Sequence, residues 1–305
     1  MTYLDCENGL TLYDAARAMG VSFTDETIPQ KKFIEANGIN FHYLEWGNSD
    51  NPPILLLHGF AQTCHSWDFI ALHLSDVFRV LALDQRGHGD TSWAIDGDYS
   101  PYKYQEDLRA VVEELGLGDI TLVGLSMGGR NAFTFAAENK NLVKNLIIVD
   151  AAPQNQKAGS ENIRRFVQQE DELDSIEDFV KRVMEYNPRR SAKQIRGSIR
   201  HNLKQLPSGK WTWKYDKILR SESKMLNHNQ EYVNKLWLYA DCINIPTLIV
   251  RGSESDVISM NTAEELHKRI INSQLITIED AGHLVVGDNP SKFGKAVKEF
   301  LSDVN

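Results

Sequence analysis

Short apolar runs that alternate with helical patterns constrain the fold of this chain more than any other feature. These runs recur along most of the sequence, and segments with amphipathic helical spacing separate them. A mostly parallel sheet covered by helices on both faces has this pattern, because its strands are buried on both sides. We expect strands at residues 32–36, 40–45, 54–57, 79–82, 120–123, 146–149, 247–250 and 274–277, and helices at 66–74, 101–115, 127–138, 262–270 and 290–301.

The alternation stops between residues 154 and 240, where the spacing is helical and the segment is too long for a plain loop. We expect this segment to be a helical cap inserted into an α/β core formed by residues 32–153 and 241–305. Residues 1–31 precede the first strand and are expected to form a separate N-terminal extension. It contains one short amphipathic helix, Leu12 to Met19, which a glycine follows.

Composition narrows the class of protein. The net charge of −9 argues against binding to nucleic acid, and we find no apolar stretch long enough to span a bilayer and no signal-peptide pattern at the N-terminus. We therefore expect a cytoplasmic protein that acts on a small molecule and binds neither nucleic acid nor membrane. The three cysteines, Cys6, Cys64 and Cys242, are expected to be reduced thiols and mostly buried. The oligomeric state is not predicted.

The segment Gly124-Leu125-Ser126-Met127-Gly128-Gly129 joins an expected strand to an expected helix. A serine hydroxyl is a poor nucleophile at neutral pH, so a nucleophilic serine needs a sharp turn that exposes it. Side chains at 124 and 128 would clash in such a turn, which is where glycine is found. We therefore predict that Ser126 is a catalytic nucleophile.

A nucleophilic serine needs a histidine to take its proton and an acid to orient that histidine. Among nine histidines, His283 follows an expected strand end and comes directly after a glycine. For the acid we predict Asp256, on the loop after the strand at 247–250. Glu254 is the near rival, and Asp150, after the strand at 146–149, is the distant one.

Backbone N–H groups are expected to stabilise the oxyanion, because the fold fixes their direction. We predict Met127, at the start of the helix after the serine, and Phe60, in the loop that follows the strand at 54–57. Gly59 lets that loop come close. His58 is expected to have a structural role, and His88 is expected at the rim of the site.

Together these motifs resemble the α/β-hydrolase superfamily. The matching segments are His58-Gly59-Phe60, residues 84–92, residues 124–129, and the loops of Asp256 and His283. The resemblance implies an α/β fold with a mostly parallel eight-stranded sheet, a cap over the site, and hydrolysis through an acyl-serine without metal or cofactor. Serine at 126, rather than aspartate, disfavours the epoxide hydrolase and haloalkane dehalogenase branches.

The resemblance favours a carboxylesterase-like serine hydrolase that cleaves a small ester or lactone. Two alternatives stay open: a C–C bond hydrolase of the meta-cleavage-product type acting on carboxylate-bearing substrates, and a non-catalytic protein that binds a small ligand. In the cap, Trp211, Trp213 and Trp237 are expected to form an aromatic pocket or to pack between cap helices. Basic residues outnumber acidic ones there, so the cap either attaches to the acidic core, presents a solvated face, or attracts anionic substrates.

Overall fold

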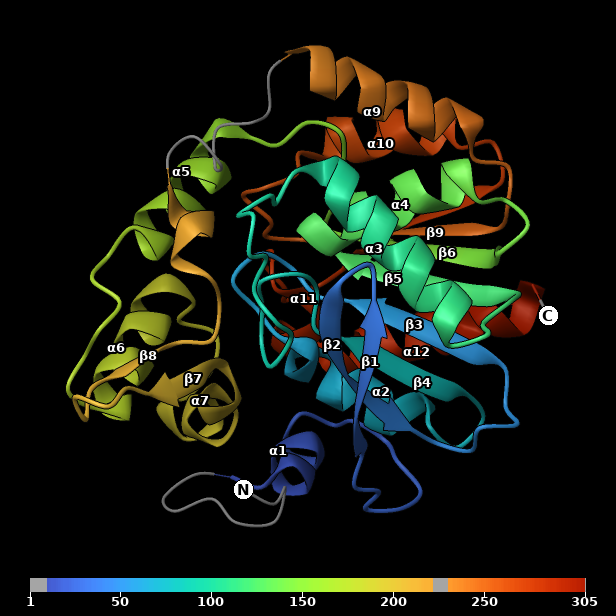
Figure 1. Cartoon of the computed structure of the whole chain (residues 1–305). Helices are drawn as coiled ribbons and strands as arrows, with labels where there is room; N and C mark the ends of the chain where they lie inside the picture. The colour runs from blue at the N-terminus through green and yellow to red at the C-terminus, as the bar shows by residue number, and fades with distance from the viewer. Residues whose placement is uncertain (1–9, 222–229, 305) are drawn as a thin grey trace.

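An eight-stranded sheet lies at the centre of the computed structural model, which describes residues 10–221 and 230–304 (Figure 1). The strands are β1 Gln30–Ala36, β2 Ile39–Trp46, β3 Pro53–Leu57, β4 Arg79–Leu83, β5 Ile120–Leu125, β6 Val143–Val149, β9 Thr247–Gly252 and β10 Ser273–Ile278. Their order is β1-β2-β4-β3-β5-β6-β9-β10; β2 is antiparallel to its neighbours and the other pairs are parallel. Each strand expected from the sequence is confirmed.

The edge hairpin of β1 and β2 turns at Asn37 and Gly38. Both residues have positive φ, 48° and 69°, as a two-residue turn between right-twisted strands requires. The antiparallel edge therefore follows from an Asn-Gly pair in the sequence.

Helices cover both faces of the sheet (Figure 1). Along β3, Leu55 and Leu57 join the apolar cluster under α3, α4, α9 and α10, whereas Ile54 and Leu56 join the cluster under α2 and α12. This alternation explains why the strand is apolar throughout. The bounds are α2 Asp68–Leu74, α3 Pro101–Glu114, α4 Met127–Glu138, α9 Gln230–Cys242, α10 Met260–Arg269, α11 Val285–Asp288 and α12 Pro290–Val304.

The cap follows β6 and combines helices with a small hairpin. Its elements are α5 Lys157–Val167, α6 Ile176–Tyr186, α7 Ala192–Ile199, the 3-10 turns η2 Arg200–Asn202 and η3 Lys217–Arg220, and the antiparallel strands β7 Leu203–Gln205 and β8 Trp211–Trp213. The cap does not extend to residue 240 as expected. Helix α9 packs against α4 and α10 of the core, because Leu236 and Ala240 are buried in the same cluster as those helices.

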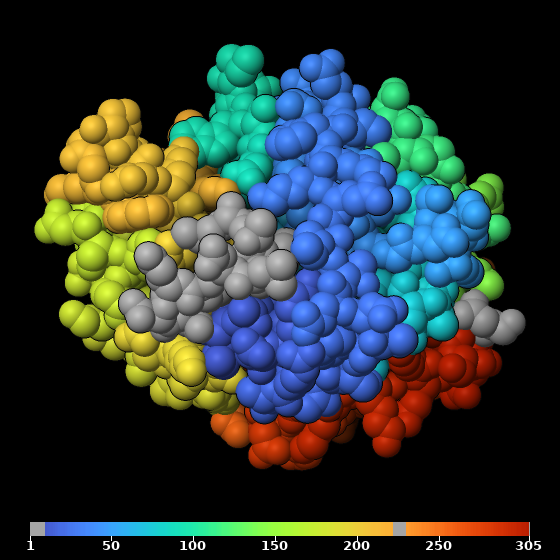
Figure 2. All heavy atoms as spheres, turned by 90° about the horizontal axis from the view of Figure 1, so that it is seen from below, coloured from blue at the N-terminus to red at the C-terminus, as the bar shows by residue number. Residues whose placement is uncertain are grey.

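The N-terminal extension is not separate from the rest of the molecule. Its helix, α1 Leu12–Ala18, contacts α7 of the cap and α2 of the core, and Figure 2 shows these N-terminal residues beside the cap. Tyr13 and Ala16 are buried in the cluster under α2 and α12. Gly20, with a φ of 67°, follows the helix end. The helix was expected from the sequence; its contacts were not.

Two further expectations concern cysteines and membranes. Cys64 is buried and Cys242 exposed, both as free thiols, so burial was predicted correctly for one of them; Cys6 lies outside the described residues. Within residues 10–221 and 230–304, no helix combines the length and apolar character that crossing a membrane requires.

Candidate active site

Ser126 occupies the sharp turn between β5 and α4. Its φ of 55° and ψ of −115° are rare for a residue with a side chain, and the surrounding contacts enforce them. A Cβ on Gly124 would lie 2.2 Å from the Gly128 carbonyl oxygen, and a Cβ on Gly128 would lie 2.2 Å from the Leu57 oxygen. The predicted reason for glycine at both positions is confirmed.

His283 lies beside Ser126, as predicted. The Ser126 hydroxyl is 3.0 Å from Nε2 of His283, which is 8% exposed. The histidine follows β10, and its loop packs tightly on the end of β9, since a Cβ on Gly252 would lie 2.2 Å from the Gly282 oxygen. The hydroxyl and the imidazole are therefore at hydrogen-bonding distance.

Asp150, and not Asp256, lies against the other nitrogen of this ring. His283 Nδ1 is 2.6 Å from Oδ2 of Asp150, which is 1% exposed. Ser255 donates to the same oxygen at 2.6 Å, and the Gly252 N–H donates to Oδ1 at 3.2 Å. Each carboxylate oxygen of Asp150 thus has a partner, as a buried charge requires.

The prediction of Asp256 is wrong in its geometry. Asp256 is exposed, and its Oδ2 accepts a hydrogen bond from Asn162 of the cap at 2.8 Å. The rival Glu254 is exposed as well and pairs with Arg189. The loop that carries both acids still contributes to the site, because its Ser255 hydroxyl holds Asp150.

The register of the sheet explains why Asp150 can contact His283 in place of the predicted Asp256. β6 and β9 are neighbours with Val149 opposite Val250, so the residues that follow both strands reach the same edge. Asp150 then turns with a φ of 43°, and its N–H donates to the Val250 oxygen at 2.7 Å. One sequence signal was available: Asp150 directly follows an apolar strand end, where burial is favoured, and a buried carboxylate needs donors.

The two backbone N–H groups predicted for an oxyanion hole belong to residues next to Ser126. Within the described chain, the N–H groups of Gly59, Ala61 and Gln62 all donate to other groups, whereas that of Phe60 has no acceptor. A Cβ on Gly59 would lie 3.4 Å from Cβ of Ser126, so this loop borders Ser126. Met127 is the first residue of α4, where a helix leaves its N–H groups unpaired.

Two buried histidines support that loop. His58 accepts from the Gln85 N–H at 3.0 Å and donates to the Gly59 oxygen at 2.7 Å, which confirms the expected structural role. His88 was expected at the rim, and this is wrong: it is fully buried and accepts from the Ala61 N–H at 3.3 Å. Burial, together with the neighbouring His58, lowers the pKa of His88 to about 3, so the ring is neutral and can accept.

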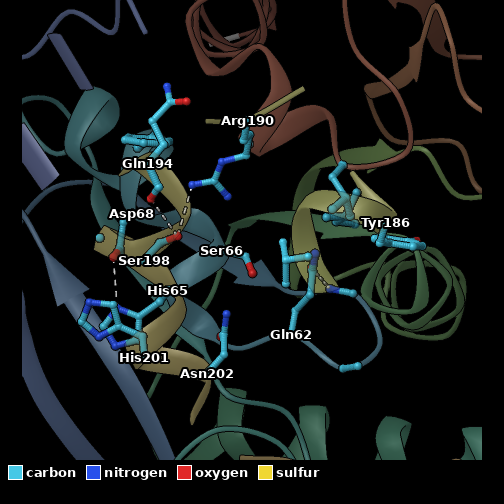
Figure 3. A pocket seen from close by; sticks show the side chains of 18 of the residues that line it. Gln62, His65, Ser66, Asp68, Tyr186, Arg190, Gln194, Ser198, His201 and Asn202 are labelled. Carbon is cyan, nitrogen blue, oxygen red and sulfur yellow. Dashed lines mark hydrogen bonds and ion pairs between the residues drawn. The ribbon is translucent and has the colours of Figure 1, made fainter. Parts of the chain in front are cut away.

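A pocket of about 210 Å³ opens beside Ser126 and His283, between core and cap. One part of its lining is apolar: Leu12, Phe60, Phe69, Phe166, Val183 and Trp213. The other part is polar: His65, Arg190, Gln194, Ser198, His201 and Asn202, all labelled in Figure 3. The N-terminal extension contributes as well, through the residues from Leu10 to Leu12 and Ala15.

Of the three tryptophans expected at the pocket, Trp213 lines it. Its ring also packs edge-on against Phe179 with centroids 4.9 Å apart, so it serves the cap core too. Trp211 does not line the pocket but packs against the cap cluster and pairs with the backbone of Leu173, which agrees with the alternative of packing within the cap. For Trp237 both alternatives are wrong, because it lies on α9 against the core cluster, beneath the Arg269 guanidinium.

The basic residues of the cap are largely paired with acids. Arg196 pairs with Glu177 and Lys217 with Glu172 inside the cap, whereas Lys214 reaches Asp90 of the core. Arg190 differs, because it lines the pocket and donates to the Ser198 hydroxyl at 3.2 Å (Figure 3).

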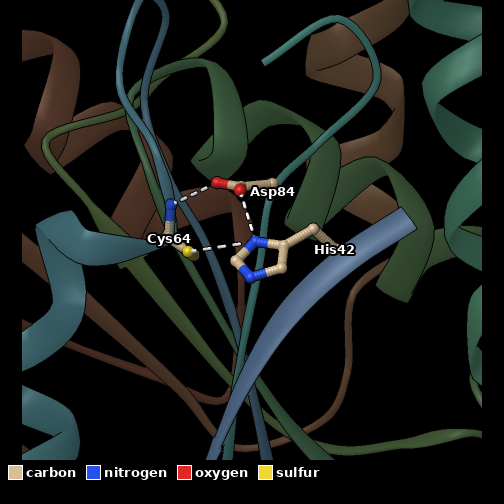
Figure 4. A group of neighbouring side chains, drawn as sticks. All are labelled: His42, Cys64 and Asp84. Carbon is tan, nitrogen blue, oxygen red and sulfur yellow. Dashed lines mark hydrogen bonds and ion pairs between the residues drawn. The ribbon is translucent and has the colours of Figure 1, made fainter. Parts of the chain in front are cut away.

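A second cluster, His42, Cys64 and Asp84, lies buried away from the pocket (Figure 4). Asp84 accepts from the Cys64 N–H at 2.6 Å, from His42 Nδ1 at 2.7 Å and from the Asp90 N–H at 2.9 Å. Both of its oxygens are therefore occupied. These bonds tie the loop after β3 to the loop after β4, and we assign the cluster a structural role.

Comparisons with known proteins agree with this architecture. A family model described as "alpha/beta hydrolase fold" matches residues 52–290. Esterase Rv0045c of Mycobacterium tuberculosis is 31% identical over 281 residues, which cover 90% of each protein. Its crystal structure matches with a TM-score of 0.76 at 28% identity and covers 97% of this chain and 98% of that one. A Bacillus subtilis protein named as a 2-succinyl-6-hydroxy-2,4-cyclohexadiene-1-carboxylate synthase is 30% identical and covers 88% of this chain and 97% of its own length.

Proposed function

The chain belongs to the α/β-hydrolase family, and from this premise we propose that it is a serine hydrolase that cleaves a small-molecule carboxylic ester or lactone. The observation that carries the proposal is the hydrogen-bonded series from Ser126 through His283 to Asp150, with distances of 3.0 and 2.6 Å. The similarity to an esterase along most of its length supports the same reaction class.

In the first half of the reaction, the Ser126 oxygen attacks the substrate carbonyl carbon and Nε2 of His283 takes the hydroxyl proton. Asp150 accepts from Nδ1, which keeps Nε2 unprotonated before attack and stabilises the imidazolium afterwards. The negative charge that develops on the carbonyl oxygen is stabilised by the N–H groups of Phe60 and Met127. His283 then gives its proton to the departing alkoxide oxygen, and an acyl-serine remains.

In the second half, water replaces the alcohol. His283 takes a proton from the water as its oxygen attacks the acyl carbon, and then returns a proton to the Ser126 oxygen as the bond to the acyl group breaks. The acid is released and the enzyme is restored. With a lactone, both products are one hydroxy acid.

A fluorophosphonate probe and a series of p-nitrophenyl esters test this proposal. We expect the probe to label the protein at one serine, and Ser126→Ala to abolish both labelling and esterase activity. Ser66 offers a matched control, because it lines the same pocket (Figure 3) and, within the described residues, has no hydrogen bond to His283; Ser66→Ala should still be labelled. Absence of labelling in the folded wild-type protein would instead favour a non-catalytic protein that binds a small ligand.

The position of Arg190 favours substrates that carry a carboxylate. Such substrates include those of the alternative function, C–C bond hydrolysis. Its guanidinium is largely buried at the pocket, and burial lowers its pKa from the ordinary value. The neighbouring Arg189 pairs with Glu254, but among the described residues Arg190 has no carboxylate within ion-pairing distance. A substrate carboxylate would supply that partner. The carboxylate in the name of the Bacillus subtilis relative is consistent with this substrate class.

The test compares a neutral ester, a p-nitrophenyl ester with a free carboxylate at the far end of its acyl chain, and a meta-cleavage dienoate. Since a hydrogen bond to a charged group contributes about 1.5–3 kcal/mol, Arg190→Gln should lower kcat/KM for the carboxylate-bearing substrate by roughly ten- to a hundredfold. The neutral ester should change by less than about threefold. Equal losses for both esters would contradict the assignment of Arg190, and cleavage of the dienoate in preference to either ester would favour C–C bond hydrolysis.

A further inference from the structure

We propose that His65, Asp68 and His201 form a binding site for a divalent transition-metal ion, such as Zn²⁺ or Cu²⁺, in the wall of the substrate pocket. One nitrogen of each histidine and one carboxylate oxygen all lie within 4.8 Å of one another. All three residues line the pocket beside Ser126 (Figure 3). The proposed ion has no part in the hydrolytic steps described above.

The local structure brings the three side chains together from the core and from the cap. His65 lies in the 3-10 turn η1, Cys64–Trp67, and Asp68 is the first residue of α2. This i, i+3 spacing places both on one side of a helical turn, with Nδ1 of His65 3.0 Å from Oδ2 of Asp68. His201 comes from η2 in the cap, and its ring stacks on that of His65 with centroids 3.7 Å apart and planes at 20°. An ion held here would join the cap to the core.

Asp68 supplies the observation that points to a ligand. Its side chain is buried, yet within the described residues Oδ1 has no hydrogen-bond partner, while Oδ2 is occupied by His65. Leaving a buried carboxylate oxygen unpaired is costly. A cation bound between Oδ1 and the imidazoles would satisfy this oxygen.

The two imidazoles offer nitrogen ligands, one from the core and one from the cap. Two imidazoles and a carboxylate suit Zn²⁺ and Cu²⁺ rather than Mg²⁺ or Ca²⁺. Three protein ligands leave a position open for water. The positive charges of Lys31 and Lys214 lie close enough to His201 to be felt there, and they lower the affinity of the site for a cation.

The other candidate ligands near the pocket are already committed. In the cluster of His42, Cys64 and Asp84, both oxygens of the acid accept hydrogen bonds. His283 lies between Ser126 and Asp150. Among the described residues, the group of His65, Asp68 and His201 therefore combines a pocket position with an unpaired ligand atom.

Titration calorimetry with Zn²⁺ tests the site directly, on protein without a histidine tag and in a buffer that does not bind metals. We expect one Zn²⁺ per chain, and a loss of at least about tenfold in affinity in the double variant His65→Asn/His201→Asn, since removing ligands costs more than the roughly 10–100-fold loss that follows from removing their outer partners. Electron paramagnetic resonance of bound Cu²⁺ should show coupling to histidine nitrogen that the double variant loses.

Matched variants separate this site from other histidines. His267 hydrogen-bonds to Ser273 outside the pocket, so His267→Asn should bind Zn²⁺ as the wild type does. His283→Asn should also retain binding, which distinguishes the site from the catalytic histidine. Circular dichroism establishes that each variant is folded. No binding of Zn²⁺ by the wild-type protein, or unchanged binding by the folded double variant, would overturn the proposal.

Inhibition is a consequence that rests on the proposed function as well. Because the ion would share the pocket with substrate, Zn²⁺ should inhibit ester hydrolysis, and a chelator should reverse the inhibition. Zn²⁺ should inhibit the double variant by a smaller fraction than it inhibits the wild type, each measured relative to its own activity without Zn²⁺. The two proposals fail separately, since calorimetry reads metal binding without any reaction, and fluorophosphonate labelling reads the nucleophile without any metal.

Discussion

Replacing Asp150 by asparagine is the sharpest test of the catalytic geometry. Oδ2 of Asp150 is 2.6 Å both from Nδ1 of His283 and from the Ser255 hydroxyl. If the asparagine NH₂ takes this position, it donates to Nδ1 and forces the proton onto Nε2. The ring then cannot accept the proton of Ser126. We therefore expect kcat to fall on the order of 10⁴-fold, as the analogous change does in serine proteases, which corresponds to about 5.5 kcal/mol.

The same substitution should lower the free energy of unfolding by less than the roughly 5.5 kcal/mol that it adds to the activation free energy. The amide leaves one buried hydrogen bond unmade at Ser255, which costs about 1–3 kcal/mol. Asp256→Asn is the matched control, because this exposed acid contacts Asn162 and not His283. It should change kcat by less than about twofold, in keeping with a surface substitution.

Steady-state hydrolysis of p-nitrophenyl acetate gives kcat for both variants, and urea denaturation gives their free energies of unfolding. A kcat for Asp150→Asn within tenfold of the wild type, in a folded protein, would refute the assignment. A collapse in Asp256→Asn would show that the loop after β9 rearranges to bring its acid to His283.

Three further predictions concern packing, pH and the pocket. A Cβ on Gly128 would lie 2.2 Å from a backbone oxygen, so Gly128→Ala should lower the free energy of unfolding by more than about 2 kcal/mol in urea denaturation, whereas Gly118→Ala, with no atom within 4 Å, should change it by less than about 1 kcal/mol. Burial lowers the pKa of His88 to about 3 from its ordinary 6.5, so the unfolded chain binds a proton more readily than the folded protein does. The free energy of unfolding should therefore fall as the pH drops from about 6.5 toward 3, by up to about 1.4 kcal/mol per pH unit. An unchanged dependence of unfolding free energy on pH in His88→Asn would contradict this. Ala15 lines the pocket, whereas Ala18 on the same helix is exposed. In a series of p-nitrophenyl esters, Ala15→Leu should therefore shift the preference toward shorter acyl chains, and Ala18→Leu should leave it unchanged. Identical profiles for the two variants would contradict a role of this helix in the pocket wall.

The fold and the sharp turn at Ser126 could be predicted from the sequence because their signals are local. Eight apolar runs with the right spacing gave eight strands, and an Asn-Gly pair gave the edge hairpin. The glycines around Ser126 predict a turn that excludes Cβ atoms, and the structure has that turn. His283 was identifiable because it follows a strand end, where loops at one edge of the sheet converge.

Tertiary structure alone decided which carboxylate contacts His283, where the cap ends and what the N-terminal helix contacts. Asp150 and Asp256 both follow strands that are neighbours in the sheet, so position along the chain does not separate them. The choice depends on a backbone turn with a φ of 43° and on donors from Gly252 and Ser255, which lie about a hundred residues further along the chain. Likewise, α1 lines the pocket and α9 belongs to the core because of the surfaces against which these helices pack. Sequence periodicity gives the face that a helix buries, but not its partner.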